Sequence, residues 1–231
     1  MMTNMETILR HRFRLHRLIS DRLLASDCEI ECQITVLPGF DSQEIHTRFA
    51  AMKLWLEDFV DNSIAYNPDS EIDINWISSL YNTAIMTPGE PMDHILAALI
   101  HAKLNAIGVG VVEISRTHFL CDTSHGFSNA ISGSTAEWLP VMSEWIGERH
   151  FHKLPWWHRG DATTIDLQPR EGDDLDNIPD LGGLLVDMVR LDDHPDDDTN
   201  TDSKSNSSEA KNAEIIKLRT KPKLVVSNED D

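Results

Sequence analysis

The chain has 231 residues, of which 39 are acidic and 20 are basic, so its formal net charge is −19. Nucleic-acid binding draws its affinity from Lys and Arg, so a charge of this sign and size argues against DNA or RNA as a partner. Three cysteines cannot build a disulfide framework, the start of the chain lacks a secretion signal, and no apolar run reaches the about 20 residues that a membrane span needs. We therefore expect a cytoplasmic, reduced protein without a membrane span.

The first predicted elements are strands. Between Met5 and Leu24, apolar residues first alternate with arginines and then take a helical spacing, which predicts a strand followed by a turn or a helix. A second alternation over residues 30–36 predicts a half-buried strand, which Pro38-Gly39 ends.

Two amphipathic helices are predicted next. Asp41 and Glu44 have the spacing of a capping box, and apolar residues then recur at steps of three and four, which predicts a helix over about 42–61. A second helix begins after Pro88-Gly89 and ends before Gly108. The region between these helices, residues 69–87, is compatible with a short strand or an inserted helix.

A long strand from Val109 to Cys121 follows the second helix. The order strand, helix, helix, strand predicts the α+β class. One further helix is predicted between Ala136 and Trp157, before a loosely packed stretch over 159–190 that is rich in Gly, Asp and Pro.

The composition predicts three parts. Residues 1–125 form the main domain, residues 126–191 form a helical and irregular extension, and residues 192–231 form a disordered acidic tail. The tail begins with a cluster of aspartates and has no aromatic residue, so it buries too little apolar surface to offset its ordering entropy.

Four short motifs, in this order of elements, carry a resemblance to a known family. They are His16-Arg17-Leu18, Phe49-Ala50-Ala51-Met52-Lys53, Thr87-Pro88-Gly89-Glu90 and Val111-Val112-Glu113-Ile114. Over about residues 8–121 the chain resembles the 6-pyruvoyl-tetrahydropterin synthase and 6-carboxytetrahydropterin synthase family of tunnelling-fold (T-fold) enzymes. The resemblance implies an antiparallel sheet with two helices on one face. It also implies a homo-oligomer, because subunits of this family assemble to close the sheets into a barrel.

The resemblance also implies a site. In that family three histidines hold zinc, a cysteine and an Asp-His pair move protons, and a glutamate on the late strand anchors the pterin ring. His16 matches the first zinc ligand, Asp27-Cys28-Glu29 stand where the family has its His-x-His pair, and Glu113 matches the ring-binding carboxylate. The Asp-His pair maps near Asp61-Asn62, so Cys28 and Asp61 are the candidate catalytic residues. Because Cys and Glu also bind zinc, a remodelled zinc site would consist of His16, Cys28 and Glu29.

Other clusters of ligand-type residues favour packing or interface roles over metal binding. Cys28 and Cys32 share one face of a strand and are expected to be buried as small apolar residues. The histidine clusters are His118 and His125 around Cys121, and His150, His152 and His158 within a Trp/His patch at 145–158.

Two functions remain open at this point. The first is a divergent protein of the pterin or 7-deazaguanine pathway, lyase-like, that binds a purine- or pterin-like ring through Glu113 and uses zinc. The second is a non-catalytic, acidic, oligomeric interaction or regulatory protein on the same scaffold. It would contact a protein partner through the tail at 192–231 and the patch at 145–158.

Overall fold

The computed structural model describes residues 5–20, 22–70, 81, 83–147 and 152–166. The chain divides into two units, Met1–Pro195 and Asp196–Asp231, and every described residue belongs to the first. The predictions for the tail, for most of 159–190 and for His150 therefore fall outside the described residues. No helix in the described ranges is long and apolar enough to cross a bilayer.

A six-stranded sheet of order β4-β3-β1-β2-β5-β6 forms the centre of the first unit. Strands β1, β2, β5 and β6 pair antiparallel, and the short strands β3 and β4 extend the sheet beyond β1 in parallel pairing. The strands are β1 (Met5–Ile19), β2 (Arg22–Val36), β3 (Ser63–Tyr66), β4 (Ala84–Met86), β5 (Val112–Cys121) and β6 (Ser128–Ser132).

Strands β1 and β2 form one long hairpin, paired from Met5↔Val36 to Ile19↔Arg22. The sequence predicted a turn or helix at the end of this first strand, and the turn is confirmed whereas the helix is wrong. Leu15 packs into the main core, while Leu18 packs on a second cluster with Ile64. Because both faces of β1 are covered there, its apolar residues lose their alternation and imitate a helical spacing.

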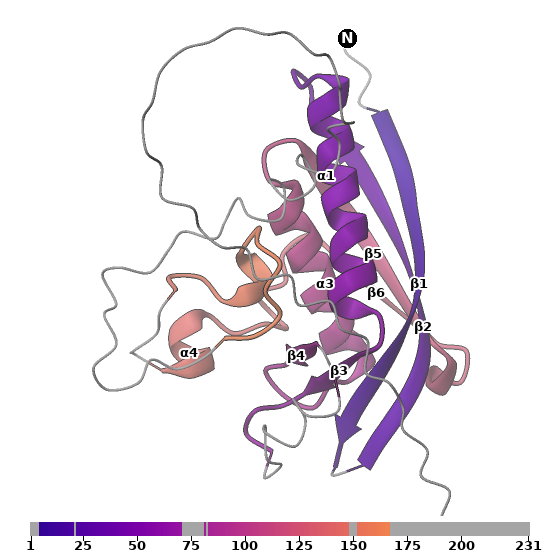
Figure 1. Cartoon of the computed structure of the whole chain (residues 1–231), viewed down its shortest axis with the longest axis vertical. Helices are drawn as coiled ribbons and strands as arrows, with labels where there is room; N and C mark the ends of the chain where they lie inside the picture. The colour runs from indigo at the N-terminus through magenta and orange to yellow at the C-terminus, as the bar shows by residue number, and fades with distance from the viewer. Residues whose placement is uncertain (1–4, 21, 71–80, 82, 148–151, 167–231) are drawn as a thin grey trace, which may run out of the picture. The chain divides into compact units, whose positions relative to one another are not determined.

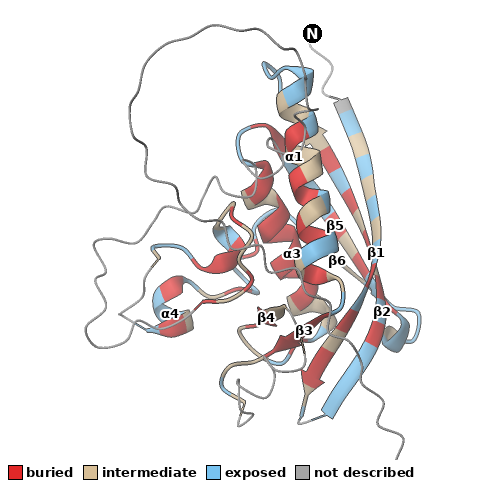
Figure 2. Ribbon diagram, in the orientation of Figure 1, coloured by how far each residue is buried: buried red, intermediate tan, exposed pale blue. Residues whose placement is uncertain are grey.

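Two helices cover one face of the sheet (Figure 1). Helix α1 (Ser42–Trp55) continues into a π-helical turn at Leu56–Val60, which confirms the predicted helix over 42–61. The backbone N–H of Glu44 donates to Oδ1 of Asp41 at 2.8 Å, so the predicted N-cap forms. The second helix, α3 (Asp93–Gly108), is almost entirely buried in the layer behind α1 (Figure 2).

The predicted fold class is confirmed by this topology. Antiparallel strands β1, β2, β5 and β6, with α1 and α3 on one face, form the T-fold-like arrangement that the resemblance implied. Strand β6 lies beyond residue 125, so the sheet continues into the part that was expected to be an extension.

Most residues of the segment 155–166 are buried or half-buried, which corrects the expectation of a loose extension for its described part, residues 159–166. The Nζ atom of Lys103 on α3 donates to the carbonyl of Trp156 at 3.0 Å and to Oδ1 of Asp161 at 3.2 Å. Asp166 accepts from the backbone N–H of Trp156 at 2.8 Å. These buried polar contacts hold the segment against α3 where sequence composition predicted little apolar packing.

Two of the three tryptophans of the predicted Trp/His patch lie in the core. Trp156 and Trp157 are 1% and 0% exposed, in a short 3-10 turn at Trp156–His158. Of the packing and interface roles that the sequence left open for this patch, these two residues therefore take the packing role. The helix predicted between 136 and 157 is also shorter than expected, since α4 covers only Met142–Ile146.

Candidate functional site

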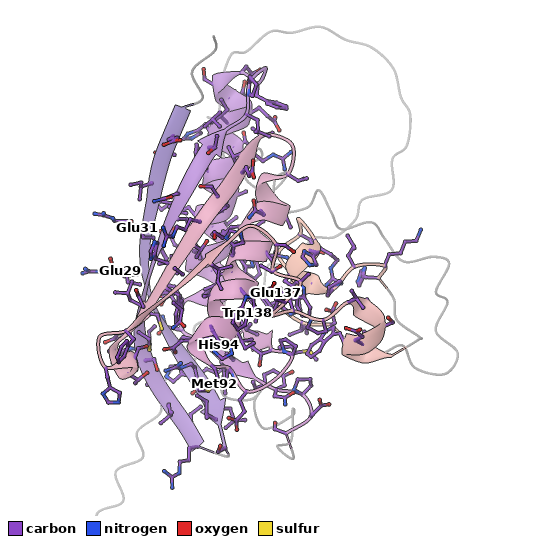
Figure 3. All side chains as sticks on the ribbon, turned by 180° about the vertical axis from the view of Figure 1, so that it is seen from behind. Glu29, Glu31, Met92, His94, Glu137 and Trp138 are labelled. Carbon is purple, nitrogen blue, oxygen red and sulfur yellow. The ribbon has the colours of Figure 1, made fainter. Side chains whose placement is uncertain are left out.

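The structure does not bring His16, Cys28 and Glu29 together. Cys28 faces the core of the sheet, whereas Glu29, the next residue of β2, lies on the opposite face and pairs with Arg12. Figure 3 shows Glu29 on the side of the strands that is turned away from the helices. His16 stacks on Tyr81, with 4.9 Å between ring centroids. The expected zinc site is therefore not formed by these three residues.

The core-facing residues at this end of the hairpin are Arg17, Ser26 and Cys28. Arg17 is 4% exposed, and its Nε and Nη2 atoms donate to Oγ of Ser26 at 3.2 and 3.0 Å. Ser26 and Cys28 have the i, i+2 spacing that places two side chains on one face of a strand. That is the spacing of the family's His-x-His pair, shifted by one residue from the position that the motif comparison suggested.

Arg17 is the centre of a closed polar cluster. Its Nη2 atom donates to Sγ of Cys121 at 3.3 Å and to the hydroxyl of Thr123, and its Nη1 atom pairs with Asp93 at the start of α3. Ser124 donates to the other carboxylate oxygen of Asp93. The guanidinium thereby joins β1, β2, β5 and α3, and each of its neighbours has a partner within the protein.

These residues do not fit zinc. A catalytic zinc site needs three deprotonated N, S or O ligands and one open position. Here a permanently charged guanidinium lies beside the two strand positions and would repel a metal cation. Across the ranges that the structure describes, no group of three or more His, Cys, Asp or Glu could hold a metal ion.

The surroundings of the two candidate catalytic residues, Cys28 and Asp61, suit a role in holding the fold together rather than in catalysis. Burial raises the pKa of the Cys28 thiol, which keeps it neutral at physiological pH. Asp61 accepts from the backbone N–H of Arg14 at 2.8 Å and from the side chain of Asn62 at 2.9 Å, so it caps the loop between α1 and β3. Cys28, Glu29 and Asp61 do line one shallow groove, together with Arg12 and Arg14.

The arginines of β1 are matched by acids of β2. The pairs follow the hairpin register and leave the outer carboxylates of β2 occupied: Arg10 with Glu31 at 2.7 Å, Arg12 with Glu29 at 2.7 Å, and Arg14 with Asp27 at 2.9 Å. These ion pairs are largely exposed, so each contributes little to stability. Their role is to pair the opposite charges on the outer face of the sheet.

Glu113 lies at the other end of β5, beside a pocket of about 730 Å³. The pocket is formed by α3, the start of β5 and the segments 133–142 and 153–158, and its lining includes His101, Ser134 and His158. The Glu113 side chain is exposed and has no hydrogen bond or ion pair within the described residues.

Asn105 positions the strand that carries Glu113. Its Oδ1 atom accepts from the backbone N–H of Ile114 at 2.9 Å, and its Nδ2 atom donates to the carbonyl of Ile114 at 3.1 Å. The neighbouring peptide of Glu113 is therefore fixed to α3, which limits where the carboxylate can lie.

The pKa values of two histidines of the pocket are shifted downward, which favours the neutral imidazole. Burial lowers the pKa of His101 and also that of His158. His101 Nδ1 shares a hydrogen bond of 3.0 Å with the hydroxyl of Thr117. A neutral imidazole provides one donor and one acceptor.

Sequence reasoning missed Arg17, His101 and Asn105. Arg17 continues the alternation of Phe13 and Leu15, so strict period two would have placed it on the core face. His101 and Asn105 interrupt the most apolar helix of the chain, and polar residues at core positions of a helix require partners. Their partners on β5, Thr117 and Ile114, lie 16 and 9 residues further along the chain, beyond the three- and four-residue spacing within a helix that local patterns detect.

Comparisons with known proteins give structural similarity only. No protein-family model matches the chain, and no curated protein matches it. A solved structure of 6-pyruvoyl tetrahydropterin synthase from Plasmodium vivax is similar with a TM-score of 0.37 and 7% identity. A structure of the same enzyme with a mutated catalytic residue has a TM-score of 0.34 and 7% identity. Each match covers 57% of this chain and 99% of the other.

Proposed function

We propose that this protein binds a pterin- or purine-like ring in the pocket beside Glu113 and does not use the zinc chemistry of the family it resembles. The observation that carries this proposal is the exposed Glu113 carboxylate, which has no partner in the described chain and lies at a pocket of about 730 Å³. A volume of this size is within the range of small-molecule sites, about 300–1,000 Å³.

The chemistry of the pocket suits such a ring. Pterins and guanine-type purines carry a ring N–H beside an exocyclic amine, and one carboxylate accepts hydrogen bonds from both groups. Apolar side chains of Leu139 and Met142 also line the pocket and offer contacts to the ring faces. The exposed imidazole of His158 can supply a donor or an acceptor for the remaining polar edge, whereas both ring nitrogens of His101 have partners within the protein.

Two features support binding without the family's catalysis. Arg17 lies beside the positions that resemble the zinc-ligand pair, and its donors are used by Ser26, Cys121 and Asp93. The Cys28 thiol is 3% exposed. A buried neutral thiol holds its proton and is a poor base, so it does not suit the proton-transfer role.

The proposal includes a homo-oligomer. Within the described sheet, β6 and β4 are edge strands, and edge strands present unpaired backbone groups to other chains. Pairing of β6 with a second copy would extend the sheet, as the T-fold resemblance implies. Light scattering on the purified full chain measures this directly, and a monomer at all concentrations would contradict it.

Calorimetric titration with a pterin and with guanine tests the ligand. We expect Glu113→Gln to weaken binding about 10-fold or more, because hydrogen bonds to a charged group contribute about 1.5–3 kcal/mol each. Glu57→Gln, a change of an exposed carboxylate on the π-helical turn, is the matched control and should leave the affinity unchanged. A metal chelator should also leave it unchanged. Equal affinity of wild type and Glu113→Gln, or no binding of either ring, would contradict the proposal.

A non-catalytic interaction role through the tail remains a separate proposal. Its sequence basis is the strongly acidic start of residues 192–231, followed by apolar residues interleaved with lysines near the end. A pull-down that compares the full chain with residues 1–191 tests it. Recovery of the same partners by the shorter chain would contradict a role for the tail.

A further inference from the structure

Cys28 and Cys121 face each other across neighbouring strands. They are directly paired in the antiparallel register of β2 and β5, and both side chains lie on the core face of the sheet. Directly opposite residues in such a pair have Cα atoms about 4.5–5.5 Å apart. This lies within the about 4.4–6.8 Å that disulfides require. Both thiols are free, and Cys121 lies close enough to Cys28 to help raise the pKa of the Cys28 thiol, of which burial is the largest cause.

The third cysteine provides an internal comparison. Cys32 lies four residues from Cys28 on β2, and its partner across the sheet is Thr117. Its sulfur is 3.5 Å from the Thr117 hydroxyl. Cys32 lies on the same strand as Cys28 and is as deeply buried, but it has no cysteine opposite it. It is therefore a control for the effect of the facing thiol.

The surroundings of Cys121 favour reaction at its sulfur. The guanidinium of Arg17 donates to Sγ of Cys121 at 3.3 Å, and the Thr123 hydroxyl is 3.0 Å from the same atom. Both donors are placed to hydrogen-bond an oxygen atom that becomes attached to this sulfur. Cys28 and Cys121 also both line the shallow groove beside Asp27 and Leu120, which gives a small oxidant a route to them.

We propose that Cys28 and Cys121 form an oxidation site that closes to a disulfide between β2 and β5 when a hydroperoxide reaches the groove. In the first step the Cys121 sulfur attacks the peroxide, a sulfur–oxygen bond forms, the oxygen–oxygen bond breaks, and the leaving oxygen takes a proton. In the second step the Cys28 sulfur attacks the Cys121 sulfur, the sulfur–oxygen bond breaks, and water leaves with the Cys28 proton. The two thiols are oxidised by two electrons and the peroxide is reduced.

The disulfide would join two strands that are distant in sequence but adjacent in the sheet. It would restrict the unfolded chain more than the folded one, so the oxidised protein should melt at a higher temperature than the reduced protein. The change is reversible by a dithiol reductant, since a disulfide is attacked by thiolates.

The test uses the full wild-type chain treated with one equivalent of hydrogen peroxide. Intact mass spectrometry should show the loss of two hydrogen atoms, and digestion without reductant should yield one linked pair of peptides, which contain Cys28 and Cys121. A bridge that includes Cys32 would overturn the proposal, as would stable sulfinic acid at either cysteine without a bridge.

Two variants, measured beside the wild type, test which cysteines form the bridge. Cys32→Ser should close the bridge to the same extent as wild type, whereas Cys121→Ser should lose it entirely. Failure of the native chain to form the bridge under conditions in which it forms in urea would also overturn the proposal, because the folded register would then oppose closure.

Discussion

The two ends of strand β5 differ in whether their polar side chains have hydrogen-bond or ion-pair partners within the protein. At the Cys121 end, Arg17 and Asp93 are satisfied by each other and by neighbouring hydroxyls. At the Glu113 end, the carboxylate has no partner within the described residues and lies at a pocket. A polar group that the fold itself satisfies holds the structure together, whereas an unsatisfied one beside a cavity is free to bind a ligand. The first end is therefore expected to control stability and the second to control binding.

The largest expected effect is at the Arg17 end. Arg17→Ala leaves the Asp93 carboxylate without its cation at a largely buried position, and removal of one partner from a buried ion pair costs about 3–5 kcal/mol. Urea unfolding monitored by tryptophan fluorescence measures the loss. Arg12→Ala removes an exposed pair on the other face of the same strand and should leave the unfolding midpoint nearly unchanged. Equal losses in the two variants would contradict the closed-cluster interpretation.

At the Glu113 end, a smaller loss of unfolding free energy is expected from substitution of Asn105, the residue that anchors β5. Asn105→Ala leaves the backbone groups of Ile114 without their partner, which should cost about 1–3 kcal/mol of unfolding free energy. We also expect weaker ring binding, because the position of Glu113 is no longer fixed. Asn129→Ala on β6 is the matched control and should change neither quantity. Wild-type affinity in Asn105→Ala would show that Glu113 does not need this anchor.

Lys103 gives a pH-dependent prediction, because it holds the segment whose residues 153–155 and 158 line the Glu113 pocket. Burial lowers the pKa of Lys103 to about 8, from its usual 10.5, and Lys103 holds the segment at Trp156. Between these two values the unfolded chain keeps a proton that the folded chain has lost. Unfolding free energy should therefore rise with pH in this window, by up to about 1.4 kcal/mol per unit.

Lys103→Met removes the group responsible for that slope. Comparison of urea midpoints of wild type and Lys103→Met between pH 8 and pH 10 isolates the contribution of Lys103 from that of other titrating groups. An identical slope in both proteins would contradict the assignment.

The smallest expected effect on stability is at Glu113 itself. Glu113→Gln removes an exposed, unpaired charge, so the unfolding free energy should change by less than about 0.5 kcal/mol. The same change should weaken ring binding. Thermal melting alongside calorimetry separates the two quantities. A large loss of stability would mean that Glu113 has a structural partner and would weaken the contrast between the two ends of β5.

Much of the fold was predictable from local patterns. The N-cap at Asp41, the apolar spacing of α1 and α3, and the alternation in β2 and β5 depend on residues close in sequence, and the structure confirms them. The zinc-ligand set His16, Cys28 and Glu29, which the resemblance implied, is not brought together by the structure, because a one-residue shift in strand alignment moves a side chain to the other face. His16 and Arg17 are adjacent in sequence, yet only Arg17 faces the core.

The sequence by itself determined the α+β class and the two helices, since these follow from periodicity, whereas the ring-binding role of Glu113 is what the family resemblance implies and stays a prediction. Only the tertiary structure decided which polar residues meet. It paired the arginines of β1 with acids of β2, joined Arg17 to Asp93, and placed Cys28 opposite Cys121. Such contacts depend on hairpin register and on the docking of α3 against the sheet, and both are set by the packing of the whole core rather than by any local stretch of chain.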